Sequence, residues 1–381
     1  ELVAGPVSVA LPAMAGTWPA KLGCSGHSRT LSASSDSTCT SAGSDTAACQ
    51  SRCTKPLCNF FDVADIQLWE PGRFRMERTI QGPSQRSKVQ VDEMFDAATG
   101  SHVAVKKMPK EWICEDHLFF TRQHPDETEQ PWIDLGISAF LTGMDYDYVC
   151  PLLGVFQCKD FTYMATEFAP HGDLLTWSAA CREVPGLVRE GMVLPLARQI
   201  VDAVRQLHNL SFVHGDISLE NIVVSHQPSS SMPFIQLIDF GMSTAGRYTS
   251  TKCGKPCYQA PEVHSGEVYD GFLSDAFSVG VVLCSVLLNQ RPWMSTQPGR
   301  CKAFESFRRN GFRATVAERK CFQQKLTMAQ CMSEQMTCAL EGLLSVDQGN
   351  RLTLGESAPF PGHRGISVLT RMPQEACLQD P

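Results

Sequence analysis

Three polar residues follow two apolar stretches at spacings that suit phosphoryl transfer. Residues 212–214 lead into Asp216, and Asn221 stands five positions further on. A second apolar run, 234–238, ends at Asp239. One carboxylate can accept the proton of an attacking hydroxyl, while an amide oxygen and a second carboxylate are ligands that suit Mg²⁺. The pattern therefore predicts Asp216 as a general base and Asn221 with Asp239 as metal ligands.

The wider pattern resembles a eukaryotic protein kinase. The motifs that carry the resemblance are His214-Gly215-Asp216 with Asn221, Asp239-Phe240-Gly241, Ala260-Pro261-Glu262, and the stretches 275–280 and 347–351. The resemblance implies an α+β, two-lobed fold over residues 69–357. The small, mostly-β lobe would run to about 166, and the larger, mostly-α lobe would start at about 167. It also implies ATP and Mg²⁺ as cofactors and a protein substrate.

The resemblance also assigns a set of nucleotide-binding residues: Gly82, Ser84, Val89, Ala104, Lys106, Thr166, Glu167, Ala169, Asp173 and Val223. Lys106 would grip the α- and β-phosphates. Ser84 and Ser87 stand where the family's phosphate loop has glycines, which serve there because the backbone must approach phosphate closely. We therefore expect a weaker grip on the nucleotide and not its loss. Asp173 would reach a ribose hydroxyl or cap a helix, and both readings stay open.

The catalytic residues implied by the resemblance are Lys106, Asp216, Ser218 and Lys255, with Asn221 and Asp239 as the metal ligands. Ser218 stands where serine/threonine kinases have a lysine, and Lys255 stands where they have a threonine. In the family's fold these two side chains lie against each other beside the catalytic aspartate. We interpret the pair as an exchange that keeps both a cation and a hydroxyl near Asp216. Two independent losses in a decaying enzyme are the alternative.

Two further departures bear on activity. Gly215 replaces the family's arginine, which elsewhere receives an activation-loop phosphate, so we expect constitutive activity or control by another route. The helix expected over 132–141 should supply an acid for Lys106, but the pairing position falls on Ile137. Asp134 lies one turn earlier, and Glu129 earlier still. Asp134 could serve only if the segment after this helix is longer than usual.

Two functions therefore remain open. The first is an active kinase acting on Ser/Thr hydroxyls, which resembles the Ser/Thr branch because Gly254-Lys255-Pro256-Cys257-Tyr258 leads into Gln259-Ala260-Pro261-Glu262. The second is a pseudokinase that binds nucleotide or a partner and acts as a scaffold or allosteric regulator. The retained chemical groups favour the enzyme, while the changes at Ile137, Ser84, Ser87 and Ser218 favour the binding module.

The elements that must position these residues can be predicted from periodicity. The sequence predicts strands over 76–80, 91–95, 103–106, 152–156 and 163–169, and helices over 132–141 and 194–207. The apolar run 279–288 is interrupted by Cys and Ser and is shorter than the ~20 residues of a membrane span, so we expect a buried helix there. His208 is expected to be a packed, hydrogen-bonded histidine.

Composition limits the other classes of function. The 381 residues are 43% hydrophobic, enough for a large core, and the net charge of −7 argues against a nucleic-acid partner. Seventeen cysteines suggest a secreted protein with disulfides, and buried thiols are the alternative reading. A zinc site is not expected because no closely spaced Cys pair couples to a second such pair or to a His pair.

The flanking segments are predicted to be an extension and a tail. Residues 1–68 read as a Cys/Ser-rich, partly disordered extension, and 358–381 as a C-terminal surface tail. The long arm, the many cysteines, the degraded phosphate loop and His214-Gly215-Asp216 together resemble the secreted rhoptry kinases of apicomplexan parasites. That resemblance implies secretion, to a rhoptry and then the host cell or parasitophorous vacuole, and a host-cell protein partner.

Overall fold

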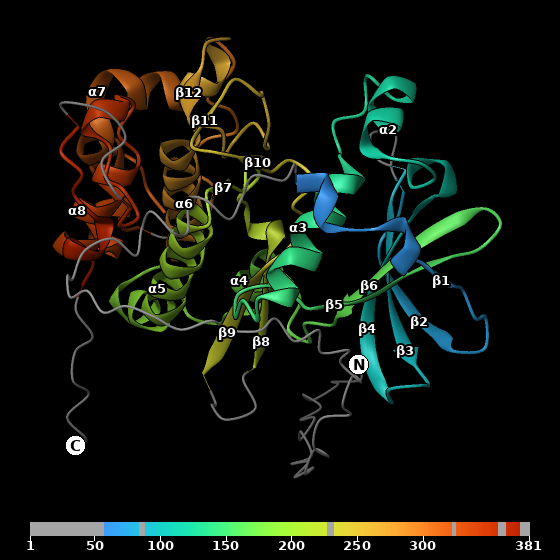
Figure 1. Cartoon of the computed structure of the whole chain (residues 1–381). Helices are drawn as coiled ribbons and strands as arrows, with labels where there is room; N and C mark the ends of the chain where they lie inside the picture. Colours follow the sequence, from blue (N-terminus) through green and yellow to red (C-terminus); the bar gives the residue numbers. More distant parts are fainter. Residues whose placement is uncertain (1–56, 84–87, 227–231, 322–324, 357–362, 374–381) are drawn as a thin grey trace, which may run out of the picture. The chain divides into compact units, whose positions relative to one another are not determined.

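The computed structural model describes residues 57–83, 88–226, 232–321, 325–356 and 363–373. Figure 1 shows six strands, β1 to β6, gathered with α2 and α3, and the helices α5 to α8 gathered with the remaining short strands. The predicted α+β, two-lobed fold is confirmed. The predictions made for residues 1–56 and for Ser84 and Ser87 lie outside the described residues.

The small lobe is built on one six-stranded sheet with the order β1-β5-β6-β4-β3-β2, in which β1 runs parallel to β5 and the other neighbours are antiparallel. Its strands are β1 (Gln67–Leu68), β2 (Phe74–Gln81), β3 (Gln90–Asp96), β4 (Ser101–Pro109), β5 (Leu152–Gln157) and β6 (Phe161–Glu167). Side chains alternate between the two faces of a strand. Val103 and Val105 are therefore buried on one face of β4, while Ala104 and Lys106 share the opposite face.

Helix α3 (Pro131–Gly143) is the main helix of the small lobe, and η3 (Lys110–Trp112) and α2 (His117–Gln123) precede it. Proline suits the first position of α3, because the first turn of a helix leaves its N–H groups unbonded anyway. Trp132 lies 4% exposed and donates its indole N–H to Trp112 O at 2.9 Å. This packing fixes the start of α3, the end that carries Asp134.

Residues 57–68 pack onto the small lobe, although the sequence analysis assigned them to the extension. They form η1 (Leu57–Phe60), η2 (Val63–Asp65) and β1. The Phe60 ring lies 4.5 Å from that of Phe140 on α3, and the Phe61 ring lies 6.5 Å from that of Trp132. Aromatic side chains in an apparently structureless stretch therefore support α3 directly.

The large lobe is mostly helical. Its helices are α4 (Leu174–Ala180), α5 (Leu187–Asn209), α6 (Gly271–Leu288), α7 (Lys302–Glu318) and α8 (Glu334–Leu343), with short 3-10 turns η4 (Leu219–Asn221), η5 (Pro261–His264), η6 (Met328–Cys331), η7 (Gln348–Asn350) and η8 (Val368–Thr370). Its short strands pair as β7 (Phe212–Val213) with β10 (Thr244–Ala245), β8 (Ile222–His226) with β9 (Pro233–Leu237), and β11 (Tyr248–Thr249) with β12 (Tyr269–Asp270).

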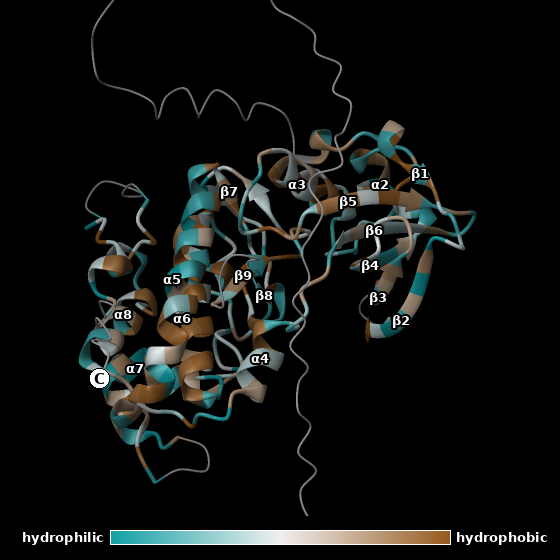
Figure 2. Ribbon diagram, turned by 90° about the horizontal axis from the view of Figure 1, so that it is seen from below, coloured by the Kyte–Doolittle hydropathy of each residue, from teal (hydrophilic) through white to brown (hydrophobic). Residues whose placement is uncertain are grey.

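Helix α6 is the centre of the large-lobe core. Figure 2 shows it hydrophobic along most of its length, and it packs against both α5 and α8. Among the described residues, α6 is the one helix that is long enough and apolar enough to cross a membrane. Its apolar window is, however, entirely buried inside the protein. Its first turn is capped by Asp270, which accepts hydrogen bonds from Phe272 N and Leu273 N. The predicted buried helix over 279–288 is thus confirmed as the second half of α6.

Two large-lobe elements extend beyond their predicted limits. Helix α5 begins at Leu187 and not at 194, because the buried Arg189 side chain donates to Val286 O and Ser178 O and ties the early turns to the core. Residues 363–373 were predicted to form a surface tail. There, however, Val368 and Met372 are buried, and the ring of His363 bonds to Arg351 O at 3.0 Å.

Candidate active site

The loop that carries Asp216 is pinned by a buried carboxylate of α6. Asp275 accepts hydrogen bonds from His214 N at 2.8 Å and Gly215 N at 3.0 Å. Ser243 closes the other side by donating its hydroxyl to His214 O at 3.0 Å. These contacts fix the backbone of His214 and Gly215, directly before Asp216.

Gly215 has a backbone reason to be glycine. Its φ is +80°, and a Cβ atom there would lie 2.6 Å from Met242 O and 3.0 Å from Cys253 Sγ. Positive φ is costly for residues that carry a Cβ. The missing arginine is therefore more than a lost phosphate receptor, because the local path of the chain excludes any side chain at this position.

Asp216 is 7% exposed and accepts four hydrogen bonds from the described residues. Asn221 Nδ2 donates to its main-chain O and to Oδ2, each at 2.8 Å, while Lys255 N donates to Oδ1 at 3.0 Å. Lys255 Nζ also donates to Oδ2, at 3.1 Å. Burial raises the pKa of Asp216, and Lys255 opposes that rise. A buried carboxylate with a raised pKa is suited to accept a proton from a substrate hydroxyl.

The structure places Ser218 and Lys255 against each other, with Lys255 Nζ 2.7 Å from Ser218 Oγ. The same ammonium lies 3.3 Å from Asn221 Oδ1, and its side chain is 37% exposed. The predicted arrangement of a hydroxyl at 218 and an ammonium at 255 beside Asp216 is thus present. Their catalytic role stays a prediction.

Lys106 on β4 is surrounded by carboxylates. Its Nζ lies 2.6 Å from Glu129, 2.8 Å from Asp134 and 3.0 Å from Asp239. Burial disfavours the ammonium, but the three carboxylates outweigh it and raise the pKa of Lys106 well above its ordinary value. Lys106 is therefore a permanent cation, the state in which it could bind phosphate.

The count that placed the lysine's partner at Ile137 is wrong. Ile137 is fully buried in the core, whereas Asp134 at the start of α3 reaches Lys106. Asp134 also accepts a hydrogen bond from Phe240 N at 3.0 Å. Glu129, which lies just before α3, was not expected to take part. The acidic residues within 126–129 were the feature of the sequence that could have indicated a partner for Lys106 there.

The two residues predicted to hold the metal each contact another residue of the site: Asp239 contacts Lys106, and Asn221 contacts Asp216. Asp239 has φ +64°, an uncommon conformation that is often found at functional sites, and its side chain is 40% exposed. Asn221 directs its Nδ2 to Asp216, and its Oδ1, which accepts a hydrogen bond from Lys255 Nζ at 3.3 Å, is the oxygen that could bind a metal. Carboxylate and amide oxygens are the hard donors that Mg²⁺ requires. The donor set at Asp239 and Asn221 therefore fits Mg²⁺.

Several residues assigned to the nucleotide lie together across the sheet. In the β4–β6 register Ala104 is opposite Thr166, which places both on the Lys106 face, and the strand ends at Glu167. Val89 is 3% exposed and precedes β3. Gly82 follows β2, and Ala169 follows the Glu167 end of β6. The structure brings these residues to one region, but their contact with a nucleotide stays a prediction.

Asp173 does cap a helix. Its Oδ1 accepts from Thr176 N at 2.7 Å at the start of α4, and its backbone forms a bridge with Val223. The capping interpretation is therefore confirmed. The ribose interpretation stays open, because Asp173 has a second carboxylate oxygen.

The segment after Asp239 is anchored to the large lobe by contacts of Glu262 and Tyr258. Arg351 Nη2 donates to Glu262 Oε2 at 3.0 Å, and the arginine side chain is completely buried. Tyr258 accepts from Leu219 N at 3.4 Å, which links the segment to the catalytic loop. The rings of His214 and Phe240 also lie 5.1 Å apart. Thr249, Ser250 and Thr251 are partly or fully exposed.

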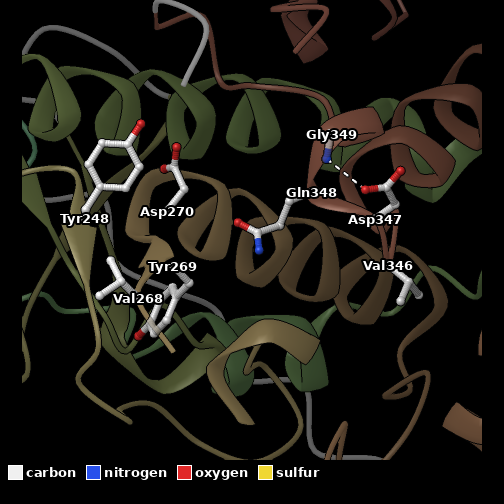
Figure 3. A pocket seen from close by; sticks show the side chains of 8 residues that line it. All are labelled: Tyr248, Val268, Tyr269, Asp270, Val346, Asp347, Gln348 and Gly349. Carbon is white, nitrogen blue, oxygen red and sulfur yellow. Dashed lines mark hydrogen bonds between the residues drawn. The ribbon is translucent and has the colours of Figure 1, made fainter. Parts of the chain in front are cut away.

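A separate surface hollow of about 470 Å³ lies between β11, β12 and η7. Figure 3 shows Tyr248, Tyr269 and Gln348 among its lining side chains, with Asp347 bonded to Gly349. Asp270, the other carboxylate of the lining, is paired with Arg247 at 2.8 Å. This hollow shares no lining residue with the cluster around Lys106 and Asp216.

Comparisons with known proteins agree with this geometry. Residues 87–359 match the family model described as "Protein kinase domain". The chain is 33% identical over 228 residues to the serine/threonine-protein kinase GIN4 of Saccharomyces cerevisiae, which covers 58% of this chain and 19% of the relative. It is 28% identical over 200 residues to the maternal embryonic leucine zipper kinase of Xenopus tropicalis, covering 51% of this chain and 27% of the relative. The chain thus spans under a third of each relative's length.

Proposed function

This chain belongs to the protein kinase domain family, and we propose that it is an active enzyme that transfers the γ-phosphate of ATP to Ser/Thr hydroxyls of protein substrates. One observation carries the proposal: Lys255 Nζ lies within 3.3 Å of Asp216, Ser218 and Asn221. A cation beside the general base is the group that the Ser218 replacement would otherwise have removed.

The chemistry proposed for these residues follows from their placement. Asp216 accepts the proton of the substrate hydroxyl, and Asn221 orients Asp216 through two hydrogen bonds. Lys255 stabilises negative charge that develops on the transferred phosphate, and Lys106 binds the phosphates of the bound nucleotide. Mg²⁺, held by Asp239 and Asn221, would neutralise phosphate charge when bound.

The alternative is a pseudokinase, which also has an observation in its favour. Lys106 is already bound by three carboxylates, so a phosphate must displace one of them. A protein that used the nucleotide site only as a scaffold could tolerate such competition. The phosphate loop, with Ser84 in place of glycine, points the same way.

Phosphate transfer to a generic Ser/Thr peptide separates the two functions. The wild type is compared, with and without Mg²⁺, with Asp216→Asn and with the control Asp160→Asn, an exposed aspartate between β5 and β6. We expect Mg²⁺-dependent transfer that falls by about 10³-fold or more in Asp216→Asn, since the general base and the charge next to Lys255 are both lost. Nucleotide binding with no transfer in the wild type would instead establish the pseudokinase.

We also propose that the protein is secreted and resembles the apicomplexan rhoptry kinases, with a host-cell protein as its substrate or partner. The seventeen cysteines and the long N-terminal arm support this. Among the described cysteines, Cys321 Sγ and Cys331 Sγ lie 3.3 Å apart. Peptide mapping without reduction, on protein from the native source, should find a disulfide between these two residues. Complete alkylation of both thiols would contradict an oxidising destination.

A further inference from the structure

The ammonium of Lys106 has no N–H donor to spare. An ammonium carries three donors and no acceptor, and three carboxylates lie within 3.0 Å of Nζ: Glu129, Asp134 and Asp239. A phosphate oxygen can bind Lys106 only after one of these carboxylates moves away. Which of them moves decides how the site accepts its ligands.

Exposure and additional bonds single out Asp239 as the carboxylate that leaves. Its side chain is 40% exposed, against 3% for Asp134 and 18% for Glu129. Asp134 is also held by Phe240 N. Asp239 is in addition the carboxylate of the three that is predicted to bind Mg²⁺. Asp134 and Glu129 would then keep Lys106 while Asp239 turns to the metal.

Glu129 is held in place by the same loop that carries Asp239. Gln130 N, next in the chain, donates to Gly241 O at 3.2 Å. A Cβ placed on Gly241 would lie 3.4 Å from Glu129 Cγ, so the glutamate side chain rests directly on that backbone. The carboxylate that competes with Asp239 for Lys106 is therefore positioned by Asp239's own neighbours.

We propose that Glu129 is a positioning residue that competes with Asp239 for Lys106 and so releases Asp239 to bind the divalent metal. This deepens the kinase function proposed above and rests on it. Without the Glu129 charge, Lys106 holds Asp239 more strongly, since fewer carboxylates share its ammonium. The local negative charge that attracts Mg²⁺ also falls. Both effects raise the Mg²⁺ concentration that the site requires.

The experiment measures ATP binding to the full chain by calorimetry over a Mg²⁺ titration, in the wild type, Glu129→Gln and Glu127→Gln. Glu127 is the matched control, because it lies in the same loop and its carbonyl, not its carboxylate, bonds to Gln130. We expect the half-saturating Mg²⁺ concentration to rise about three- to tenfold in Glu129→Gln only. ATP affinity without Mg²⁺ should stay equal or become tighter, and the melting temperature should stay unchanged.

A Mg²⁺ requirement in Glu129→Gln within twofold of the wild type would overturn the proposal. Glu129→Asp provides a second test if the glutamine variant folds poorly: its carboxylate is one methylene shorter, so an intermediate requirement is expected, and a wild-type value would be equally contradictory. Because binding is the readout, a wild type that binds Mg²⁺ and ATP but transfers no phosphate defeats the proposed enzyme, while the Mg²⁺ requirement of Glu129→Gln relative to the wild type still decides this inference. A wild type that binds no nucleotide overturns both.

Discussion

Two lysines serve this site, and their surroundings differ in charge. Lys106 is bound by three carboxylates and is 15% exposed, whereas Lys255 has one carboxylate and two neutral oxygens as partners and is 37% exposed. Charge-assisted hydrogen bonds are the stronger kind. Lys106 is therefore a fixed anchor, while Lys255 can turn toward a new negative charge at a lower free-energy cost.

The contrast drawn between Lys106 and Lys255 would be wrong if Lys255 contributed nothing to turnover. Lys255→Ala should lower kcat about 10²- to 10³-fold, the usual effect of losing one group that stabilises charge in the transition state. Lys252→Ala, an exposed lysine of the same segment, is the control and should leave kcat unchanged. Transfer assays under saturating ATP and Mg²⁺ measure both. An unaltered kcat in Lys255→Ala would mean that the two replacements are independent losses.

The exchange itself has a sharper test. Ser218→Lys alone places a second ammonium beside Lys255 and should lower kcat through like-charge repulsion. Adding Lys255→Thr restores one cation and one hydroxyl in exchanged positions, so the double variant should recover at least about tenfold over Ser218→Lys. A double variant no better than the product of the single effects would argue against the exchange.

On the Lys106 side, Asp134 is expected to have the next largest effect. Asp134→Ala removes the partner of Lys106 and the acceptor of the buried Phe240 N–H. We expect kcat/KM to fall about 10²-fold and the free energy of unfolding to fall by about 2 kcal/mol. Asp134→Asn keeps an oxygen for Phe240 and should lose activity with little change in stability. Chemical denaturation and transfer assays separate the two contributions, and equal destabilisation in both variants would contradict this division.

His208 is a third cation to set beside the two lysines, and its charge depends on pH. His208 is fully buried; burial alone would lower its pKa, but the carboxylates of Asp275 and Glu356 raise it to about 9. Its unfolded value is near 6.5, so its stabilisation is complete below pH 6.5 and is lost as the pH rises through 9. Between these values the free energy of unfolding should fall by about 1–3 kcal/mol. His208→Gln should flatten that part of the profile, while His226→Gln, an exposed histidine, should not.

Much of the fold could be predicted because its signals are local. Val103 and Val105 alternate as a half-buried strand requires, and the apolar run 279–288 marked the core helix. The start of α5 was missed because Leu187 and Val188 are exposed apolar residues that blur the periodicity, while the contact that fixes this end is made by a polar residue, Arg189. The packing of 57–68 depends on tertiary contacts of Phe60 and Phe61, which no local pattern reports.

The site was predicted where motifs fix the backbone and missed where a side chain crosses between elements. Asp216, Asn221 and Asp239 follow from order and spacing. Counting residues along the helix pointed to Ile137 and left Asp134 as a conditional alternative, because the count assumes a glutamate in mid-helix and this chain uses a shorter acid one turn earlier. Glu129 reaches Lys106 from outside any helix or strand. Sequence spacing carries no information on such a contact.

The backbone at Gly215 makes it hard to restore the family's arginine at this position. A lineage that lost the arginine here, or an engineer who wished to restore it, could not do so with one codon change. The new Cβ would collide with Met242 O at 2.6 Å, and the path of the following segment would have to be rebuilt first. Restoring the family's arginine would therefore require changes in the segment around Met242 as well as at position 215.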